Sequence, residues 1–189
     1  MEALALQGGF SDAPVEAAIA FRAVMRVMAR PGTVEHVAGA VPPAPLSVAA
    51  GGILLTLCDP ETPVHLAGEA DCAAVRDWIT FHTGAPLVGR ERTAFAVGTW
   101  TDLLPLEGYP MGLAEYPDRS ATLIVELDVL ETRGARLTGP GIEREAALSL
   151  PETAAFRANA ARYPLGLDFV FTCGDQVAAL PRTTRVEAG

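Results

Sequence analysis

The stretch that decides the fold covers residues 163–186 and reads YPLGLDFVFTCGDQVAALPRTTRV. Apolar and polar residues alternate over residues 167–172, which is the period of two typical of a β-strand. Gly174-Asp175 predicts a tight turn, because glycine adopts a positive φ without a steric clash. We expect residues 177–180 to return as an antiparallel strand that ends at Pro181, since proline cannot donate to a ladder.

The tetrad Arg182-Thr183-Thr184-Arg185 follows this hairpin and is the densest group of anion-binding side chains in the chain. Two fixed cations beside two hydroxyls can bind phosphate-like oxygens. The alternative is a solvated C-terminal tail. Asp168 is an unusual acid within an apolar strand, and it either faces water or pairs with an arginine. The hairpin could return Arg182 or Arg185 to its side.

The composition indicates one acidic globular unit spanning residues 1–189, of which half are hydrophobic. A formal charge of −9 repels nucleic acid and anionic lipid, so we expect neither as a partner. The longest apolar run, residues 46–58, is shorter than the ~20 residues that a membrane helix needs. The high apolar content suggests a surface covered by a partner.

All 14 basic residues are arginines, and the chain contains no lysine. This excludes an aldimine between a lysine and pyridoxal phosphate (PLP), a Walker-type lysine and a Ser–Lys dyad. We therefore expect no cofactor. The sequence also lacks the GxSxG, GxGxxG and P-loop patterns, so its catalytic residues are unknown and any enzymatic role of its own is uncertain.

The cysteines and the N-terminal residues bear on the cellular compartment. Cys58, Cys72 and Cys173 are odd in number and far apart, and residues 1–6 have no basic segment or cleavage signal. We expect reduced thiols and a cytoplasmic location. Cys58 and Cys173 lie in apolar surroundings and are interpreted as packing residues.

Helical and extended patterns alternate first, and hairpin patterns follow. We expect a three-layer αβα sandwich around a mixed, partly antiparallel sheet. Helices are predicted from Pro14 to Arg30 and at residues 46–58, 71–81 and 151–161. Strands are predicted at residues 33–37, 62–67, 93–98, 122–130, 136–138, 167–172 and 177–180. Residues 100–120 lack periodicity and are predicted to form a long loop of the kind that often binds a partner.

Hydrophobic spacing predicts which side chains face the core. The core-facing set on the two amphipathic helices and on the strand at 122–130 is Ala17, Phe21, Val24, Met25, Met28, Ala74, Val75, Trp78, Phe81, Leu123, Val125, Leu127 and Val129. On the same strand, Glu126 and Asp128 are predicted to face away. Arg22, Arg26 and Arg30 form an outward stripe, which is either a solvated face or a surface for phosphate or a partner.

The three histidines do not suggest a metal site. His36, His65 and His82 are far apart and have no paired ligand spacing, so we expect no bound metal. His65 is interpreted as a packed or hydrogen-bonded strand residue. His82, with Thr83 at a helix C-terminus, is the better candidate for ligand contact, although a structural role explains it equally well.

An ordered set of short motifs resembles the PhnH family, a subunit of the carbon–phosphorus lyase core complex. It extends over residues 13–186, except for poor matches at 38–45 and 99–119. The matching pieces are Phe21-Arg22, MARPG at 28–32, LLTL at 54–57, TPV at 62–64, FHTGAPLV at 81–88, ATLI at 121–124, LTG at 137–139, Gly141-Ile142, PLGLD at 164–168, TCG at 172–174 and PRTT at 181–184.

The resemblance implies a homodimer whose fold looks like a truncated PLP-dependent transferase without PLP. It also implies a complex with subunits G, I and J. With an associated L protein, subunits G, H and I couple an alkylphosphonate to the ribose triphosphate of ATP and release adenine. Subunit J then cleaves the C–P bond.

Three hypotheses follow. In the first, the chain is a non-autonomous subunit in which Arg182, Thr183, Thr184 and Arg185, with His82 and Thr83, contact phosphonate or nucleotide oxygens or a neighbouring subunit. In the second, it is an architectural dimer that touches no ligand. In the third, it is an independent anion-binding module or enzyme that shares only the fold.

Overall fold

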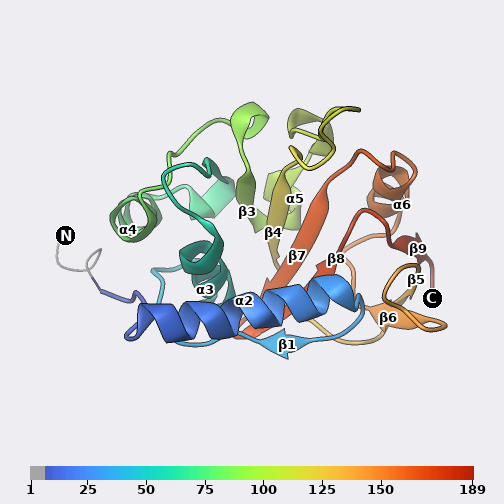
Figure 1. Cartoon of the computed structure of the whole chain (residues 1–189), viewed down its shortest axis with the longest axis horizontal. Coiled ribbons are helices and arrows are strands. Elements are labelled where there is room, and N and C mark those ends of the chain that lie inside the picture. The colour runs from blue at the N-terminus through green and yellow to red at the C-terminus, as the bar shows by residue number, and fades with distance from the viewer. Residues whose placement is uncertain (1–6) are drawn as a thin grey trace.

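A six-stranded mixed sheet crosses the molecule in the order β1-β8-β7-β4-β3-β2 (Figure 1). The computed structural model describes residues 7–189; the feature read from residues 1–6 lies outside them. The strands of this sheet are β1 (Glu35–His36), β2 (Val64–Leu66), β3 (Phe95–Thr99), β4 (Thr122–Glu126), β7 (Asp168–Cys173) and β8 (Gln176–Leu180). The helices are α2 (Ala13–Ala29), α3 (Val48–Leu57), α4 (Ala73–Thr83), α5 (Trp100–Leu103) and α6 (Ala154–Ala160).

The hairpin predicted from residues 167–180 is confirmed and makes the sheet mixed. Strands β2, β3, β4 and β7 are parallel neighbours, whereas β8 runs antiparallel to β7. Gly174 forms the turn at φ +60°, in the left-handed region that favours glycine. The predicted hairpin after residue 133 forms a separate sheet of three strands, which are β5 (Ala135–Thr138), β6 (Ala146–Leu148) and β9 (Arg185–Glu187).

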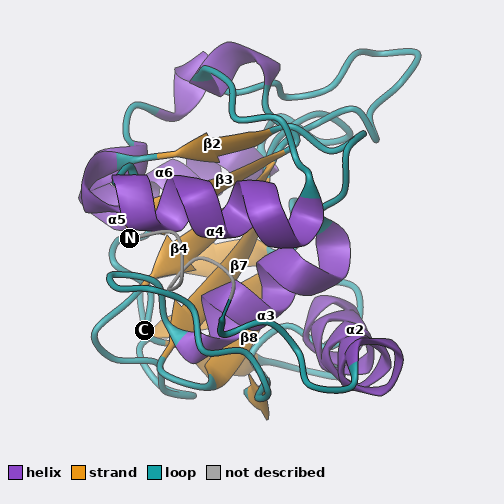
Figure 2. Cartoon of the chain, turned by 90° about the vertical axis from the view of Figure 1, so that its left-hand side faces the viewer, coloured by secondary structure: helices purple, strands orange, loops and turns teal. Residues whose placement is uncertain are grey.

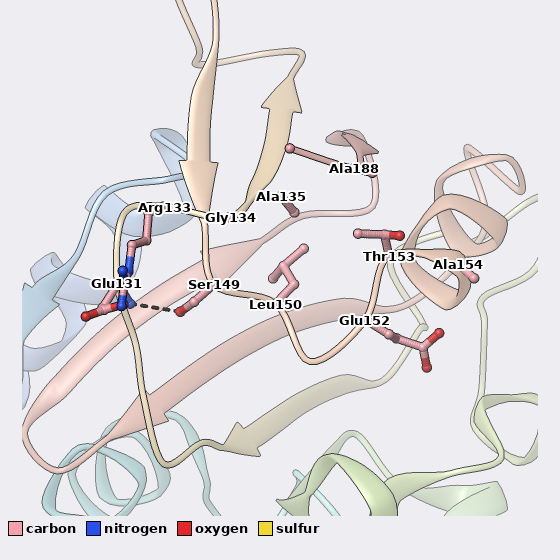
Figure 3. A pocket seen from close by; sticks show the side chains of 11 residues that line it. Glu131, Arg133, Gly134, Ala135, Ser149, Leu150, Glu152, Thr153, Ala154 and Ala188 are labelled. Carbon is pink, nitrogen blue, oxygen red and sulfur yellow. Dashed lines mark hydrogen bonds and ion pairs between the residues drawn. The ribbon is translucent and has the colours of Figure 1, made fainter.

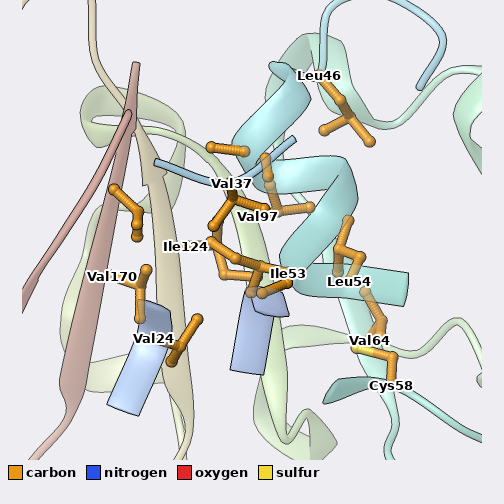
Figure 4. Packing of buried hydrophobic residues seen from close by; sticks show 14 of the residues in the cluster. Val24, Val37, Leu46, Ile53, Leu54, Cys58, Val64, Val97, Ile124 and Val170 are labelled. Atoms are coloured by element: carbon orange, nitrogen blue, oxygen red, sulfur yellow. The ribbon is translucent and has the colours of Figure 1, made fainter. Parts of the chain in front are cut away.

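Apolar side chains on both faces of the six-stranded sheet produce two cores. On one face, Val97, Ile124 and Val170 pack with α2, α3 and α4 (Figures 2 and 4). On the other, Phe169 and Phe171 pack with α5, α6 and the small sheet. Successive strand residues point to opposite faces, so a strand buried on both sides reads as a continuous apolar run. This confirms a mixed α/β architecture with helices on either side of the sheet.

The apolar segment at residues 46–58 forms the predicted buried helix, α3. The Ser47 hydroxyl accepts a hydrogen bond from the Ala50 N–H (3.1 Å) and caps its first turn. Gly51 and Gly52 allow close packing, because a Cβ on each would lie 2.6 Å from Pro42 Cγ and 2.5 Å from Val37 Cγ1, respectively. Helix α3 therefore sits tightly against the preceding loop.

Several predictions of core-facing residues are wrong. Helix α2 buries the small residues Ala20 and Ala23 together with Val24 and Val27, while Phe21 and Met25 remain about half exposed. Small side chains let α2 approach α3 and β8 closely, so the helix is rotated from the orientation that residue size suggested.

The other corrections have similar local causes. Phe81 is 56% exposed at the last turn of α4, where Val75, Trp78 and Ile79 fill the core and Ala74 faces outward. Val129 is exposed because β4 ends at Glu126, so the alternation no longer sets its direction.

The segment at residues 100–120 is more ordered than predicted. It begins with α5 and a 3-10 turn (Leu106–Gly108), and it buries Trp100 against Phe156 with ring centroids 4.7 Å apart. Its second half, residues 111–120, is closed by a bridge between Met111 and Ser120, and we call it the arm. Single apolar anchors separated by Pro and Gly leave no periodic pattern, which explains why the sequence resembled a loop.

Within residues 7–189, no helix is both long and apolar enough to cross a bilayer.

Candidate functional site

Arg182, the first residue of the predicted anion-binding tetrad, forms a clamp with Asp168. The Arg182 backbone N–H and Nε donate to Asp168 Oδ1 at 2.8 and 3.2 Å, and Nη2 contacts Asp168 Oδ2. The same guanidinium donates to the Pro117 carbonyl through Nη1 (2.8 Å) and to the Ser120 hydroxyl. It therefore fastens the arm to the start of β7.

This clamp is largely removed from solvent. The Arg182 and Asp168 side chains are only 13% and 17% exposed. The prediction that Asp168 either faces water or pairs with a returning arginine is settled in favour of the pair. A half-buried guanidinium with these internal acceptors has a structural role, whereas its role in ligand binding stays a prediction.

The other three tetrad residues point to different places. Thr184 is buried, and its Oγ1 has no hydrogen-bond partner among the described residues. Arg185 is exposed on β9, opposite Thr138, and makes no ion pair within the described part of the chain. Thr183 is half-buried beside Gly139. Arg185 is thus the tetrad cation that remains available to an external anion.

His82 and Thr83 are not brought to the tetrad. They lie at the end of α4, whereas β9 lies at the opposite side of the molecule (Figure 1). The His82 ring packs against Trp78 and Phe81, and its Nε2 lies 3.2 Å from the Gln7 carbonyl oxygen. Thr83 Oγ1 donates to the Ile79 carbonyl (2.7 Å).

Thr83 Oγ1 also accepts the Ala85 N–H (3.1 Å). With Gly84 in the left-handed conformation, these bonds end α4, so the local sequence HTG is explained by helix capping. His65 Nδ1 lies 3.1 Å from the Val88 carbonyl oxygen, which confirms the prediction of a hydrogen-bonded strand histidine.

The carboxyl ends of the parallel strands, where open α/β sheets usually bind ligands, hold the chain's own carboxylate. Glu126 Oε1 accepts the Ser47 N–H at the start of α3 (2.7 Å), and Oε2 accepts the Thr172 hydroxyl (2.8 Å). A helix N-terminus favours anions, so Glu126 takes the position that an external anion would otherwise occupy. Sequence alternation had placed Glu126 facing away, and no local signal connected it with Ser47.

An open groove of about 850 Å³ lies between the small sheet and the start of α6 (Figure 3). Its charged side chains already have partners: Arg133 pairs with Glu131, and Glu152 accepts the Trp100 indole N–H at 3.0 Å. The groove can accommodate a polar segment or small molecule, but these pairs leave no charged lining group free for acid–base work.

A second cleft, of about 710 Å³, lies between the glycine-rich segment at residues 7–9, the loop at 41–43 and the first turn of α4. Its polar side chains are Gln7, Ser11 and Asp77. These groups can form hydrogen bonds with a neutral or cationic molecule, but they supply no cation for a phosphate.

Neither metal nor thiol chemistry is supported by the geometry. Among residues 7–189 there is no cluster of three His, Cys, Asp or Glu side chains able to hold a metal ion. Burial raises the pKa of the Cys58 thiol to about 12, and the neighbouring Asp59 adds to this effect. Cys58 therefore stays protonated and packs in the core, as predicted.

Comparison with known proteins gives one concordant result. The family model described as bacterial phosphonate metabolism protein (PhnH) matches residues 8–187. A protein of Rhizobium meliloti (strain 1021), named alpha-D-ribose 1-methylphosphonate 5-triphosphate synthase subunit PhnH, is 39% identical and aligns with 95% of this chain and 94% of its own length. A protein of Stutzerimonas stutzeri, named "Putative C-P lyase subunit protein HtxG", is 29% identical and aligns with 94% of each chain.

The clamp predicts different outcomes for the two tetrad arginines. Arg182→Ala should lower the free energy of unfolding by about 3 kcal/mol, because it leaves the Asp168 carboxylate without its partner in a half-buried site. Arg182→Lys should fall between wild type and alanine, because an ammonium keeps the charge but not the fork. Chemical denaturation monitored by circular dichroism gives these values.

Arg185→Ala is the matched control and should change the free energy of unfolding by no more than about 0.5 kcal/mol. Equal losses at the two positions would contradict the structural role of Arg182.

The buried thiol predicts selective protection. At about pH 8, only roughly one Cys58 in ten thousand would be a thiolate, so iodoacetamide should modify it far more slowly than Cys72 or Cys173. Peptide mass spectrometry over a time course measures the three rates, and a denatured sample, in which all three should react alike, is the control. Rapid labelling of Cys58 in the native protein would refute this assignment.

Proposed function

The chain belongs to the PhnH family of bacterial phosphonate metabolism proteins, and from this membership we propose that it is a subunit of a synthase in organic phosphonate catabolism. The proposed reaction joins an alkylphosphonate to the ribose triphosphate of ATP, which gives a ribose 1-alkylphosphonate 5-triphosphate and releases adenine. The observation that carries the proposal is the 39% identity to a synthase subunit, because the alignment covers nearly the whole of both chains.

The proposed assembly is a carbon–phosphorus lyase core complex that contains subunits G, I and J. The names of both relatives support it, since each describes a subunit. We propose that the chain has no turnover alone and acts in the cytoplasm. The internal use of Arg182, Asp168, Thr83 and Glu126 is compatible with a subunit that contributes shape and contacts.

Within this proposal, Arg185 and Thr183 are the best candidates for phosphonate or triphosphate oxygens. Arg185 presents an unpaired guanidinium to solvent, and its planar fork suits a phosphate-like group. The alternative is a purely architectural subunit. We further propose that the fold is related to a truncated PLP-dependent transferase and that the chain works without PLP, because no lysine is available for an aldimine.

The proposed homodimer has a candidate surface on α2. Val15, Ile19, Phe21 and Met25 are each about half exposed, which is unusual for four large apolar side chains on one helix. A two-fold axis would bring the same patch of both copies together and remove these side chains from water.

Co-expression tests the proposed function. A tagged chain produced with subunits G, I and J should retain all three through size-exclusion chromatography. With the L protein, ATP and methylphosphonate, this complex should release adenine, which is measured by liquid chromatography. The tagged chain alone should release none, and robust release by the isolated chain would contradict the proposal.

Arg185→Ala separates the ligand role from the architectural one. Normal assembly with about tenfold lower adenine release would favour ligand contact, since one charge-assisted bond is worth roughly 1.5–3 kcal/mol. Unchanged release would favour the architectural alternative.

The α2 surface predicts the oligomeric state. The wild-type chain should be a dimer by light scattering, and the double variant Ile19→Glu, Met25→Glu should be a monomer, because the charges would be buried unpaired in the interface. Val129→Glu, a similarly exposed apolar position on another element, should stay dimeric. A dimeric double variant would exclude this surface.

A further inference from the structure

The arm is fastened firmly at its base. Besides the Arg182 bonds to Pro117 and Ser120, the Met111 carbonyl accepts the Gly166 N–H (2.9 Å), and the Pro110 carbonyl accepts the Ala121 N–H (2.8 Å). Both ends of the arm are therefore held by the strands of the main sheet. A segment held in this way loses little conformational freedom when it binds.

The tip of the arm is also ordered by its own contacts. Leu113 and Tyr116 exchange two backbone hydrogen bonds of 3.1 and 3.0 Å, and the Arg119 guanidinium carbon lies 4.2 Å from the centroid of the Tyr116 ring. Gly112 has a φ of +83°, and a Cβ there would lie 2.6 Å from the Pro117 carbonyl oxygen. The chain thus specifies a defined turn at this position.

This ordered tip holds apolar side chains in water. Leu113 is 56% exposed and Tyr116 is 49% exposed, so neither gains much from folding the chain itself. Tyrosine and arginine are among the residue types that dominate binding at protein interfaces. A rigid turn that displays Leu, Tyr and Arg has the character of a protein-binding element.

A small groove begins at the base of the arm. Its volume is about 220 Å³, and Leu104, Met111, Ala155 and Ala158 line it with apolar surface. Tyr163, which is exposed, follows Arg162 at the rim. The arm offers projecting side chains and the groove accepts one, which is the complementary pattern found in the centre of stable interfaces.

We propose that the arm and this groove form one docking surface, and that its occupant is a different subunit of the complex rather than a second copy of this chain. The inference rests on the proposed function. Glu107, Glu115 and Asp118 lie on or beside the arm, whereas Arg119 is held over Tyr116. On a chain of net charge −9, this surface suits an apolar side chain surrounded by basic residues and disfavours an acidic copy of itself.

The position of the arm agrees with this assignment. The connection that contains it rises at the top of Figure 1, while α2, the proposed dimer surface, runs along the bottom. The two surfaces can therefore be occupied at the same time, one by a second copy and the other by a different subunit.

The test uses the tagged chain co-expressed with subunits G, I and J. The double variant Leu113→Glu, Tyr116→Ser should retain about tenfold less of at least one of these subunits, because two exposed binding side chains are lost. Its oligomeric state alone and its thermal unfolding should match the wild type, since neither side chain packs in the core. Val41→Glu, an exposed apolar position outside the arm, should retain the subunits normally.

Each outcome decides between the possibilities. Loss of subunit capture with an unchanged oligomeric state supports the proposal. Unchanged capture overturns it, and a changed oligomeric state with normal capture assigns the arm to self-association, which also overturns it. If the wild-type chain captures no subunit, the proposed function fails and this assignment fails with it. A photoreactive phenylalanine analogue at Tyr116 should cross-link to G, I or J; a cross-link only to a second copy would overturn the proposal.

Discussion

The ion pair between Arg182 and Asp168 holds together parts of the chain that lie far apart in sequence. It fixes the start of β7, the end of the β7–β8 hairpin and the base of the arm with one side chain. An arginine can do this because its planar head donates in several directions at once. Since β7 is the strand that joins the parallel half of the sheet to the antiparallel half, the orientation of the arm is coupled to the centre of the fold.

Much of the fold could be predicted from the sequence, because strands buried on both faces and capped helices leave local patterns. The β7–β8 hairpin, the buried helix α3 and the turn at Gly174 belong to this class. The inward faces of α2 and α4 could not be assigned in this way. The choice between Ala20 and Phe21 depends on how closely a neighbouring helix approaches, and that distance is not encoded within the helix.

The candidate site was harder to predict, since its chemistry depends on contacts between distant residues. The possible pairing of Asp168 with an arginine could be anticipated, because the hairpin brings the two close. The attachment of Glu126 to Ser47 and Thr172 could not, because it joins three segments whose order in space follows from the sheet. The tetrad looked like one cluster in sequence, yet strand alternation separates Thr184 from Arg185.

The glycines of the small sheet bring together three of the motifs that identify the family. A Cβ on Gly141 would lie 2.0 Å from the Ala29 carbonyl oxygen, and one on Gly139 would lie 3.1 Å from the Thr183 carbonyl oxygen. The end of α2, the turn at residues 139–141 and the tetrad are therefore mutually dependent in shape. A chimaera that exchanged only one of these segments with a distant relative would combine mismatched backbones, so recombination between family members would have to transfer all three together.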